Sequence, residues 1–283
     1  MNNFTYSVPT KIHFGKGQIS HLYELSESGN KVLLCYGGGS IKKAGIYDEA
    51  VKILKEEDIE IFELSGIAPN PKIESVREGV KLCKENDIDM VLAIGGGSVI
   101  DCAKVVAAGA CYDGDPWDLV ITPRWIKKAL PIYSVLTLSA TGSEMDPFAV
   151  ISDMSKNEKW GTSSEHMKPK MSILDPEYTY SVSKKQTAAG TADMISHICE
   201  NYFTNVKNAD VQARFAEGLL KNCFKYGPIA LEEPDNYDAR ANLMWTASMA
   251  INGILSDGAE VSWCVHPMEH ELSAFYDITH GEG

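Results

Sequence analysis

The chain has 283 residues, of which 44% are hydrophobic and 23% are charged, which is enough for one large globular domain or two ordinary ones. Its 26 Lys and Arg residues against 39 Asp and Glu residues give a formal net charge of −13 at pH 7. This acidic balance argues against a nucleic-acid or anionic-membrane partner, because phosphate binding needs clustered positive charge.

The seven cysteines are scattered, and none forms a C-x-x-C pair. An odd number of dispersed cysteines is typical of a reduced intracellular chain rather than a disulfide scaffold. The N-terminus lacks the basic and then apolar pattern of a secretory signal, and the longest apolar run, near Val105 to Cys111, is too short to cross a bilayer. We therefore expect a soluble, cytoplasmic protein.

The first half of the chain alternates strand patterns with helical patterns. Apolar runs predict strands, and amphipathic spacing predicts the helices between them; the expected strands are 32–36, 59–64 and 90–94, and the expected helices are 47–57, 74–86 and 99–108. Buried strands separated by helices indicate a parallel sheet covered on both faces. Residues 1–181 are therefore predicted to form an α/β domain with a Rossmann-like parallel sheet.

The second half is predicted to be entirely helical. Strand patterns fade after Leu174-Asp175-Pro176, and the expected helices are 184–203, 209–226, 237–255 and 267–275. Gly227-Pro228 is predicted to end the second of them. We place a domain boundary near residue 181 and expect residues 182–283 to form an all-α domain.

Two Gly-Gly-Gly-Ser loops each follow an apolar strand and precede a helix. Glycines there let backbone N–H groups approach an anion, and the helix N-terminus favours negative charge. A single such loop would more often be a tight turn alone, but two of them together with the Thr-rich stretch 136–144 favour a nucleotide site without the usual G-x-G-x-x-G pattern. Asp101 and Lys104 lie one turn into the second helix and are expected to face the same mouth. The loop residues are Gly37, Gly38, Gly39 and Ser40, and Gly95, Gly96, Gly97 and Ser98.

Histidines and a carboxylate gather in two places in the second half. Asp193 and His197 are four residues apart in a predicted helix and so share one face. His266, His270 and His280 fall within fifteen residues near the end. One carboxylate with several imidazoles suits Fe²⁺ or Zn²⁺, although a single helical His is more often a core residue. The order His-Pro-Met-Glu-His differs from the zinc-protease H-E-x-x-H, and no G-x-S-x-G is present, so neither class of hydrolase is expected.

Taken together, these motifs resemble the iron-containing (group III) alcohol dehydrogenases, and most closely their NAD(P)H-dependent butanol dehydrogenase branch. The resemblance runs from Phe-Gly-Lys-Gly (14–17) to the last residue. It rests on Gly-Gly-Gly-Ser-Val-Ile-Asp (95–101), Leu-Thr-Leu-Ser-Ala-Thr-Gly-Ser-Glu (136–144), Gly-Thr-Ala-Asp-Met-Ile-Ser-His (190–197) and His-Pro-Met-Glu-His-Glu-Leu-Ser-Ala (266–274).

The resemblance implies a role for each of these motifs. Asp193, His197, His266 and His280 match the four metal ligands of the family, and His270 matches a histidine near the reacting centre that does not bind the metal. The pyrophosphate is expected at residues 95–98 and the adenosine near residues 37–40. Asp101 and the side chains of the Thr-rich stretch belong to the same expected cofactor site; the latter are Thr137, Leu138, Thr141 and Ser143.

The end of the chain departs from the family pattern. The resemblance implies further helices after His280-Gly-Glu, whereas this sequence stops at Gly283. We therefore expect a helical domain that is truncated at its C-terminus, with His280 on a segment that little holds in place. Either the sequence is a fragment, or its metal site is looser and wetter than those of the family.

The chemistry expected is hydride transfer between a nicotinamide coenzyme and a small aliphatic alcohol or aldehyde. A divalent ion would act as a Lewis acid on the substrate oxygen, and His270 would relay the proton, because an imidazole titrates in the right range. Lys42 and Lys43 follow the first glycine loop and slightly favour NADP(H) over NAD(H). Fe²⁺ and Zn²⁺ stay open, and a homodimer is compatible with the resemblance. The alternatives are a glycerol dehydrogenase-like or lactaldehyde reductase-like enzyme, or a non-catalytic nucleotide-binding fragment.

Overall fold

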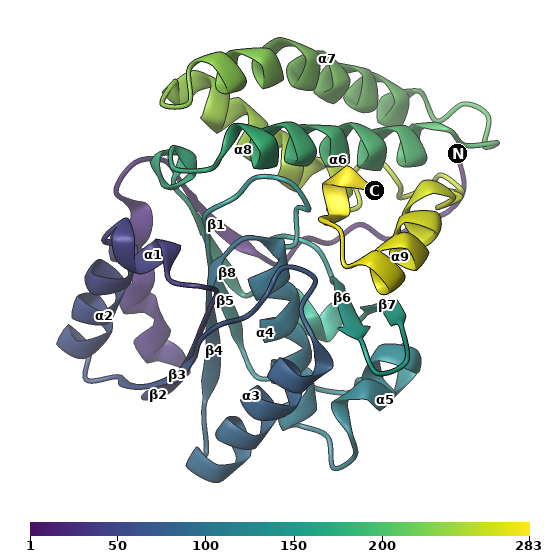
Figure 1. Cartoon of the computed structure of the whole chain (residues 1–283). Helices are drawn as coiled ribbons and strands as arrows, with labels where there is room; N and C mark the ends of the chain where they lie inside the picture. Colours follow the sequence, from purple (N-terminus) through teal and green to yellow (C-terminus); the bar gives the residue numbers. More distant parts are fainter.

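The computed structural model describes all 283 residues and has a six-stranded parallel sheet at its centre (Figure 1). The strand order is β1-β8-β5-β4-β2-β3. The strands are β1 (Lys11–Phe14), β2 (Lys31–Tyr36), β3 (Glu60–Leu64), β4 (Met90–Gly95), β5 (Ile132–Leu136) and β8 (Met171–Leu174). This confirms the parallel sheet that the buried apolar runs predict, and adds three strands, β1, β5 and β8, that the sequence did not reveal.

Both faces of the sheet are buried, because alternate residues of each strand point to opposite sides. On β2, Leu33 and Cys35 pack into one core, while Val32 and Leu34 pack into the other. The first face is covered by α3 (Ile73–Asn86), α4 (Gly97–Ala110) and α5 (Pro116–Ile121), and the second by the 3₁₀ segment η1 (Gln18–Ser28) and α2 (Ile46–Glu56). The short α1 (Ser40–Lys43) precedes α2, and 3₁₀ turns η2 (Pro123–Trp125), η3 (Glu165–Met167) and η4 (Pro176–Thr179) lie between the later elements.

The topology of the sheet fixes where a ligand can bind. From β2 the chain crosses to β3 on one side, and then returns to place β4 on the other side of β2. Such a switch point leaves a crevice beyond the carboxyl ends of β2 and β4. The loop that begins at Gly37 follows β2, and the loop that begins at Gly95 ends β4. Both glycine loops therefore border the same crevice.

An antiparallel hairpin that the sequence did not predict stands beside the sheet. Strand β6 (Phe148–Asp153) pairs with β7 (Glu158–Ser163), and Asn157 takes a left-handed conformation in the turn between them. Its signal was weak, since only the start of β6 is apolar and β7 is largely polar. The hairpin contacts α4 of the first half and α9 (Val265–Tyr276) of the second, so it lies between the two halves of the chain.

The second half is helical, as predicted, and lies across the carboxyl end of the sheet (Figure 1). Its elements are α6 (Lys184–Tyr202), α7 (Asp210–Glu232), α8 (Tyr237–Ile251), α9 (Val265–Tyr276) and the 3₁₀ turn η5 (His280–Glu282). The predicted stop at Gly227-Pro228 is wrong, because α7 continues through Pro228 to Glu232. Gly227 packs against Thr191 of α6, so tertiary contact outweighs the local tendency to end the helix.

No strand follows Leu174, and α6 begins at Lys184. The boundary at residue 181 falls in that interval and stays a prediction. No helix of the structure combines the length and the apolar character that crossing a membrane requires.

Candidate active site

Four predicted metal ligands converge in the cleft between the sheet and the helices. Asp193 and His197 lie one turn apart on α6, His266 lies in the first turn of α9, and His280 begins η5. The Nε2 atoms of the three imidazoles lie 3.6, 3.5 and 3.5 Å from Asp193 Oδ1, in the order His197, His266 and His280. The four ligand atoms all lie within 4.8 Å of one another.

Two further carboxylates orient two of the imidazoles. Glu200, one turn beyond His197, accepts a hydrogen bond from Nδ1 of His266, and Glu269 accepts one from Nδ1 of His280 at 2.5 Å. Burial opposes ionisation of both carboxylates. Hydrogen bonds from the backbone of Val265 and from His266 nevertheless lower the pKa of Glu200, and the hydrogen bond from His280 lowers that of Glu269 to about 2, so each ionised group can only accept. Each carboxylate thereby fixes a ring proton on Nδ1, which leaves Nε2 directed at the cluster.

This donor set fits a small divalent cation. Nε2 of His266 is buried and has no hydrogen-bond partner within the protein, a costly state for a polar atom unless something else binds it. A tetrahedral ion with bonds of about 2.1 Å separates neighbouring ligand atoms by about 3.4 Å. The observed 3.5 to 3.6 Å from the carboxylate oxygen matches that spacing.

The charges of the cluster follow from burial and mutual proximity. Burial would raise the pKa of Asp193, but His197 and the other imidazoles outweigh it and hold that pKa well below its usual range. Burial lowers the pKa of His197 to about 4, so this ring is neutral at pH 7 and its lone pair is available. The cluster is therefore one fixed negative charge surrounded by imidazoles, which is an attractive site for a cation.

The segment that carries His280 is well held, and the expectation of a loose segment is wrong. Gly281 lies so close to α6 that a Cβ there would come within 2.4 Å of the carbonyl oxygen of Ala189. Glu282 forms an ion pair with Lys185 of α6 at 2.6 Å, and Asn70 donates a hydrogen bond to the carbonyl of Ile278 at 2.8 Å. These contacts fix the position of His280.

A groove of about 370 Å³ runs along the crevice at the switch point of the sheet and ends at the metal cluster. Most of the predicted nucleotide-binding residues line it. They are Gly37, Gly38, Ser40, Gly95, Gly96, Gly97, Ser98, Thr137, Leu138 and Thr141, and the groove also reaches Asp193 and His280. Gly39 does not line the groove; it has a φ of 102°, a left-handed conformation that favours glycine, and it precedes α1.

The second glycine loop is built for close approach. A Cβ at Gly97 would come within 2.3 Å of Oγ1 of Thr141, so only glycine lets this loop pack against the Thr-rich loop that follows β5. The loop opens directly into the fourteen-residue helix α4, whose first backbone N–H groups are free to bind an anion. This supports the pyrophosphate position that the sequence suggested.

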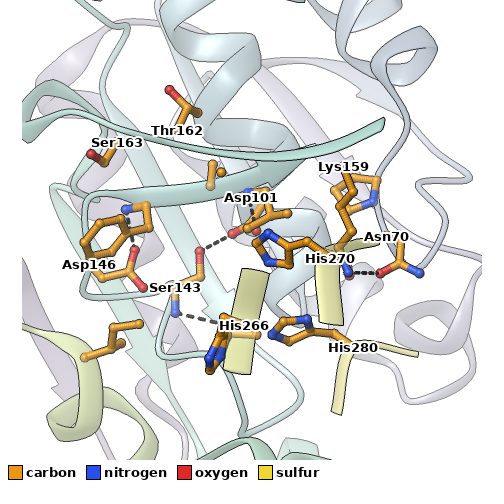
Figure 2. A pocket seen from close by; sticks show the side chains of 18 of the residues that line it. Asn70, Asp101, Ser143, Asp146, Lys159, Thr162, Ser163, His266, His270 and His280 are labelled. Carbon is orange, nitrogen blue, oxygen red and sulfur yellow. Dashed lines mark hydrogen bonds between the residues drawn. The ribbon is translucent and has the colours of Figure 1, made fainter. Parts of the chain in front are cut away.

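Asp101 and Ser143, which were also predicted to bind the cofactor, do not line the groove. They line a second cavity, of about 340 Å³, which meets the groove at Ser98, Thr141 and His280. Ser143 donates a hydrogen bond to Asp101 at 2.6 Å, as Figure 2 shows, and the backbone N–H of Val150 donates another at 2.9 Å. Both side chains are thus engaged with the protein itself at the inner end of the cofactor path.

The spacing of Lys104 from Asp101 suggested that both face the mouth of the crevice, but Lys104 does not. Its side chain is fully buried and donates to Asp146 at 2.8 Å and to Ser143 at 2.9 Å. Burial raises the pKa of Asp146 to about 7, although Lys104 opposes the shift. The pair anchors Ser143, and through it Asp101, from behind the cavity.

Lys159 and Asn70 are among the residues of this cavity that the sequence did not indicate. Lys159 of β7 donates to Asn70 at 3.1 Å (Figure 2). It also forms an ion pair with Glu269 at 3.1 Å. Burial lowers the pKa of Lys159. Asn70 sits between two prolines that indicated only a turn, and Lys159 lies in the unpredicted hairpin, so neither carried a local signal of function.

His270 faces the same cavity from α9, beside His266 and His280 (Figure 2). Its Nε2 atom is buried and has no hydrogen-bond partner. Burial and the nearby Lys159 lower the pKa of His270 to about 3, so the reason given for a relay, an imidazole that titrates near neutrality, is wrong at this position. The ring is neutral at pH 7 and offers a hydrogen bond rather than a charge.

Models of one family match both halves of the chain. The model described as iron-containing alcohol dehydrogenase matches residues 9–176, and the model for the C-terminal part of the same family matches residues 187–283. The chain belongs to the iron-containing alcohol dehydrogenase family. The resemblance drawn from the motifs is thereby confirmed.

Relatives in this family are similar over the full length of the chain. An NADH-dependent butanol dehydrogenase A of Clostridium acetobutylicum is 60% identical over 284 residues, and an NADPH-dependent aldehyde reductase of Escherichia coli is 44% identical over 285 residues. Each match covers 100% of this chain and 73% of the relative. The crystal structure of an NADH-dependent butanol dehydrogenase A from Thermotoga maritima superposes with a TM-score of 0.97 at 48% identity, covering 99% of this chain and 71% of that one.

Family membership confirms the reaction class and the fold expected from the sequence. The protein is a nicotinamide- and metal-dependent oxidoreductase that interconverts small alcohols and aldehydes. The α/β half supplies the groove for the coenzyme, and the helical half supplies all four of the converging donor side chains.

Proposed function

We propose that this dehydrogenase reduces short aliphatic aldehydes, such as butanal, with NADH, using one Fe²⁺ held by Asp193, His197, His266 and His280. The observation that carries the proposal is the convergence of three Nε2 atoms on one oxygen of Asp193, at the point where the nucleotide groove meets the second cavity. When bound, the ion supplies Lewis-acid polarisation of a substrate oxygen and the coenzyme supplies the hydride.

The walls of the second cavity support a small apolar substrate. Trp263 packs edge-on against His266 at 5.1 Å between ring centroids, and Phe148 and Ile251 complete an apolar side. Such walls exclude water from the reacting centre while leaving the polar groups on one side. A polyol would have to bury hydroxyl groups against these apolar walls, which disfavours the glycerol dehydrogenase-like alternative.

His270 and Lys159 are the protein groups we assign to the substrate side of the site. The neutral His270 ring, with its unpartnered Nε2, forms a hydrogen bond to the substrate oxygen and relays to it a proton taken up from water. Lys159, held by Glu269 and Asn70, keeps positive charge beside that oxygen. Each works from a fixed position, because its other contacts hold its side chain in place.

The surroundings of the first glycine loop support NADH rather than NADPH. The sequence favoured NADPH slightly because of Lys42 and Lys43. Lys42, however, stacks over the rings of Tyr36 and Tyr47 and lies 3.8 Å from a carboxylate oxygen of Glu63. Its charge is thus already balanced, and Glu63 would repel a 2′-phosphate at this end of the groove.

We keep residue 181 as the division between the coenzyme domain and the metal domain. The absence of strands after Leu174 and the start of α6 at Lys184 support it. The homodimer stays a prediction that sedimentation analysis would test.

A substrate and coenzyme profile of the iron-loaded enzyme tests the proposal. We expect kcat/KM with butanal to exceed that with lactaldehyde and with dihydroxyacetone, and NADH to be preferred over NADPH. A preference for either hydroxylated substrate would overturn the assignment of the substrate. Coenzyme binding without metal binding or turnover would instead identify a nucleotide-binding fragment.

A further inference from the structure

A second cluster of metal-type donors lies outside the catalytic cleft. His13 on β1 and His21 and Glu24 on η1 bring their ligand atoms within 4.8 Å of one another. None of the three lines either cavity of the active site. From this geometry we infer that His13, His21 and Glu24 form a separate Zn²⁺ site, which ties the edge strand β1 to η1.

The distances within this cluster resemble those of the catalytic cluster. Oε1 of Glu24 lies 3.0 Å from Nε2 of His13 and 3.2 Å from Nδ1 of His21. Tetrahedral coordination with bonds of about 2.1 Å needs about 3.4 Å between ligand atoms, so the ligand atoms here lie a few tenths of an ångström closer together than a bound ion would hold them. Two imidazoles and one carboxylate, with the fourth position left to water, are a donor set that zinc accepts.

One donor atom of this cluster has no partner within the protein. Nε2 of His13 is buried and forms no hydrogen bond of acceptable geometry, although a carboxylate oxygen lies beside it. The same condition marks Nε2 of His266 in the catalytic cluster.

The carboxylate is already oriented for binding through one oxygen. Oε2 of Glu24 accepts from Lys11 at 2.6 Å, which leaves Oε1 facing the two imidazoles. This arrangement matches the outer contacts that hold a metal-binding carboxylate in position. The rings of His13 and His21 are nearly parallel, with centroids 3.6 Å apart, and His197 and His266 show the same stacking at 4.5 Å. To admit the ion, His21, the most exposed of the three side chains, turns outward.

Counting bound zinc per chain tests the inference. With Zn²⁺ supplied to the full chain in equilibrium dialysis, we expect two ions for the wild type, one for His21→Gln, one for Glu24→Gln and one for Asp193→Asn. The double variant D193N/H21Q should bind none. His166→Gln, which removes an exposed histidine elsewhere, is the matched control and should still bind two.

A thermal melt gives a second measurement that is independent of activity. Zinc should raise the Tm of D193N, because an ion that binds only the folded state stabilises it, and it should leave the Tm of D193N/H21Q unchanged. One ion for the wild type, or two for H21Q, would overturn the second site. Unchanged binding in D193N would count against the proposed catalytic ligands instead, so the two failures are distinguishable.

Discussion

Nε2 of His280 lies 3.5 Å from Oδ1 of Asp193, which joins the end of the chain to the middle of α6. His197 and His266 approach the same oxygen at nearly the same distance. One oxygen therefore serves as the common neighbour of three imidazoles from three elements.

Replacing this carboxylate should abolish metal binding. We expect Asp193→Asn to lose the Fe²⁺ and with it turnover, because the amide keeps the shape of the side chain but removes the only negative charge among the four ligands. Metal analysis and kcat measure the effect. Asp238→Asn, in the first turn of α8, is the control. A variant that retained one iron per chain and normal kcat would show that Asp193 is not a ligand.

The outer carboxylates should tune metal affinity rather than decide it. For Glu200→Gln we expect metal affinity to fall about 10–100-fold, since His266 would lose the partner that orients its ring. Competition with a chelator measures this change. Glu271→Gln, an exposed position on α9, should have no effect. Equal metal affinities for E200Q and E271Q would show that Glu200 does not support metal binding.

Because the second glycine loop is closely packed, adding a single methyl group at Gly97 should destabilise the protein. Gly97→Ala would place a Cβ within 2.3 Å of Thr141, so we expect a loss of about 1–3 kcal/mol of stability and weaker coenzyme binding. Urea unfolding and coenzyme titration measure the two effects. The control is Gly218→Ala, at an exposed position of α7 where an added Cβ would meet nothing within 4 Å. This variant should gain about 0.5–1 kcal/mol of stability. Wild-type coenzyme affinity in G97A would argue against a phosphate at this loop.

Coenzyme preference should respond to the charge of Glu63. In Glu63→Gln the amine of Lys42 loses its carboxylate partner, and we expect the ratio of kcat/KM for NADPH to that for NADH to rise roughly fivefold, as an exposed charge contact contributes about 1 kcal/mol. Glu60→Gln, an exposed residue on the same strand, is the control. An unchanged ratio in E63Q would show that Lys42 does not take part in the choice.

The same carboxylate predicts how this preference varies with pH. Burial opposes ionisation of Glu63, but hydrogen bonds from Tyr36 and Tyr47 outweigh it and lower its pKa. The group is therefore fully charged above the ordinary pKa of about 4.3, and its hold on Lys42 weakens only as the pH falls through the lowered value. We expect the ratio of kcat/KM for NADH to that for NADPH to stay constant between about pH 6 and about pH 9, measured with saturating aldehyde.

His270 should affect turnover more than binding. If it passes the proton, His270→Gln should lower kcat about 10²-fold and leave the Kd of the coenzyme unchanged, because the ring lines the cavity and not the groove. His166→Gln, an exposed histidine, is the control. A variant with full kcat at every pH would end the proposed role of His270 in proton transfer.

Local patterns predicted much of the architecture. Apolar runs such as 90–94 became β4, helical spacing such as 74–86 became α3, and the two glycine loops lie where strands give way to helices. These features depend on neighbours in the chain, so sequence spacing records them. The hairpin β6–β7 and the passage of α7 through Pro228 were missed, because distant contacts decide both.

The sequence by itself determined the family, and it predicted the residues of a metal site and the positions of phosphate-binding loops, since each is carried by a short motif. Only the tertiary structure decided that Glu200 and Glu269 orient the imidazoles, that Lys159 and Asn70 reach the cavity, and that burial takes His270 out of the neutral pH range. Contacts and burial depend on which segments fold against one another, and spacing along a chain does not record that.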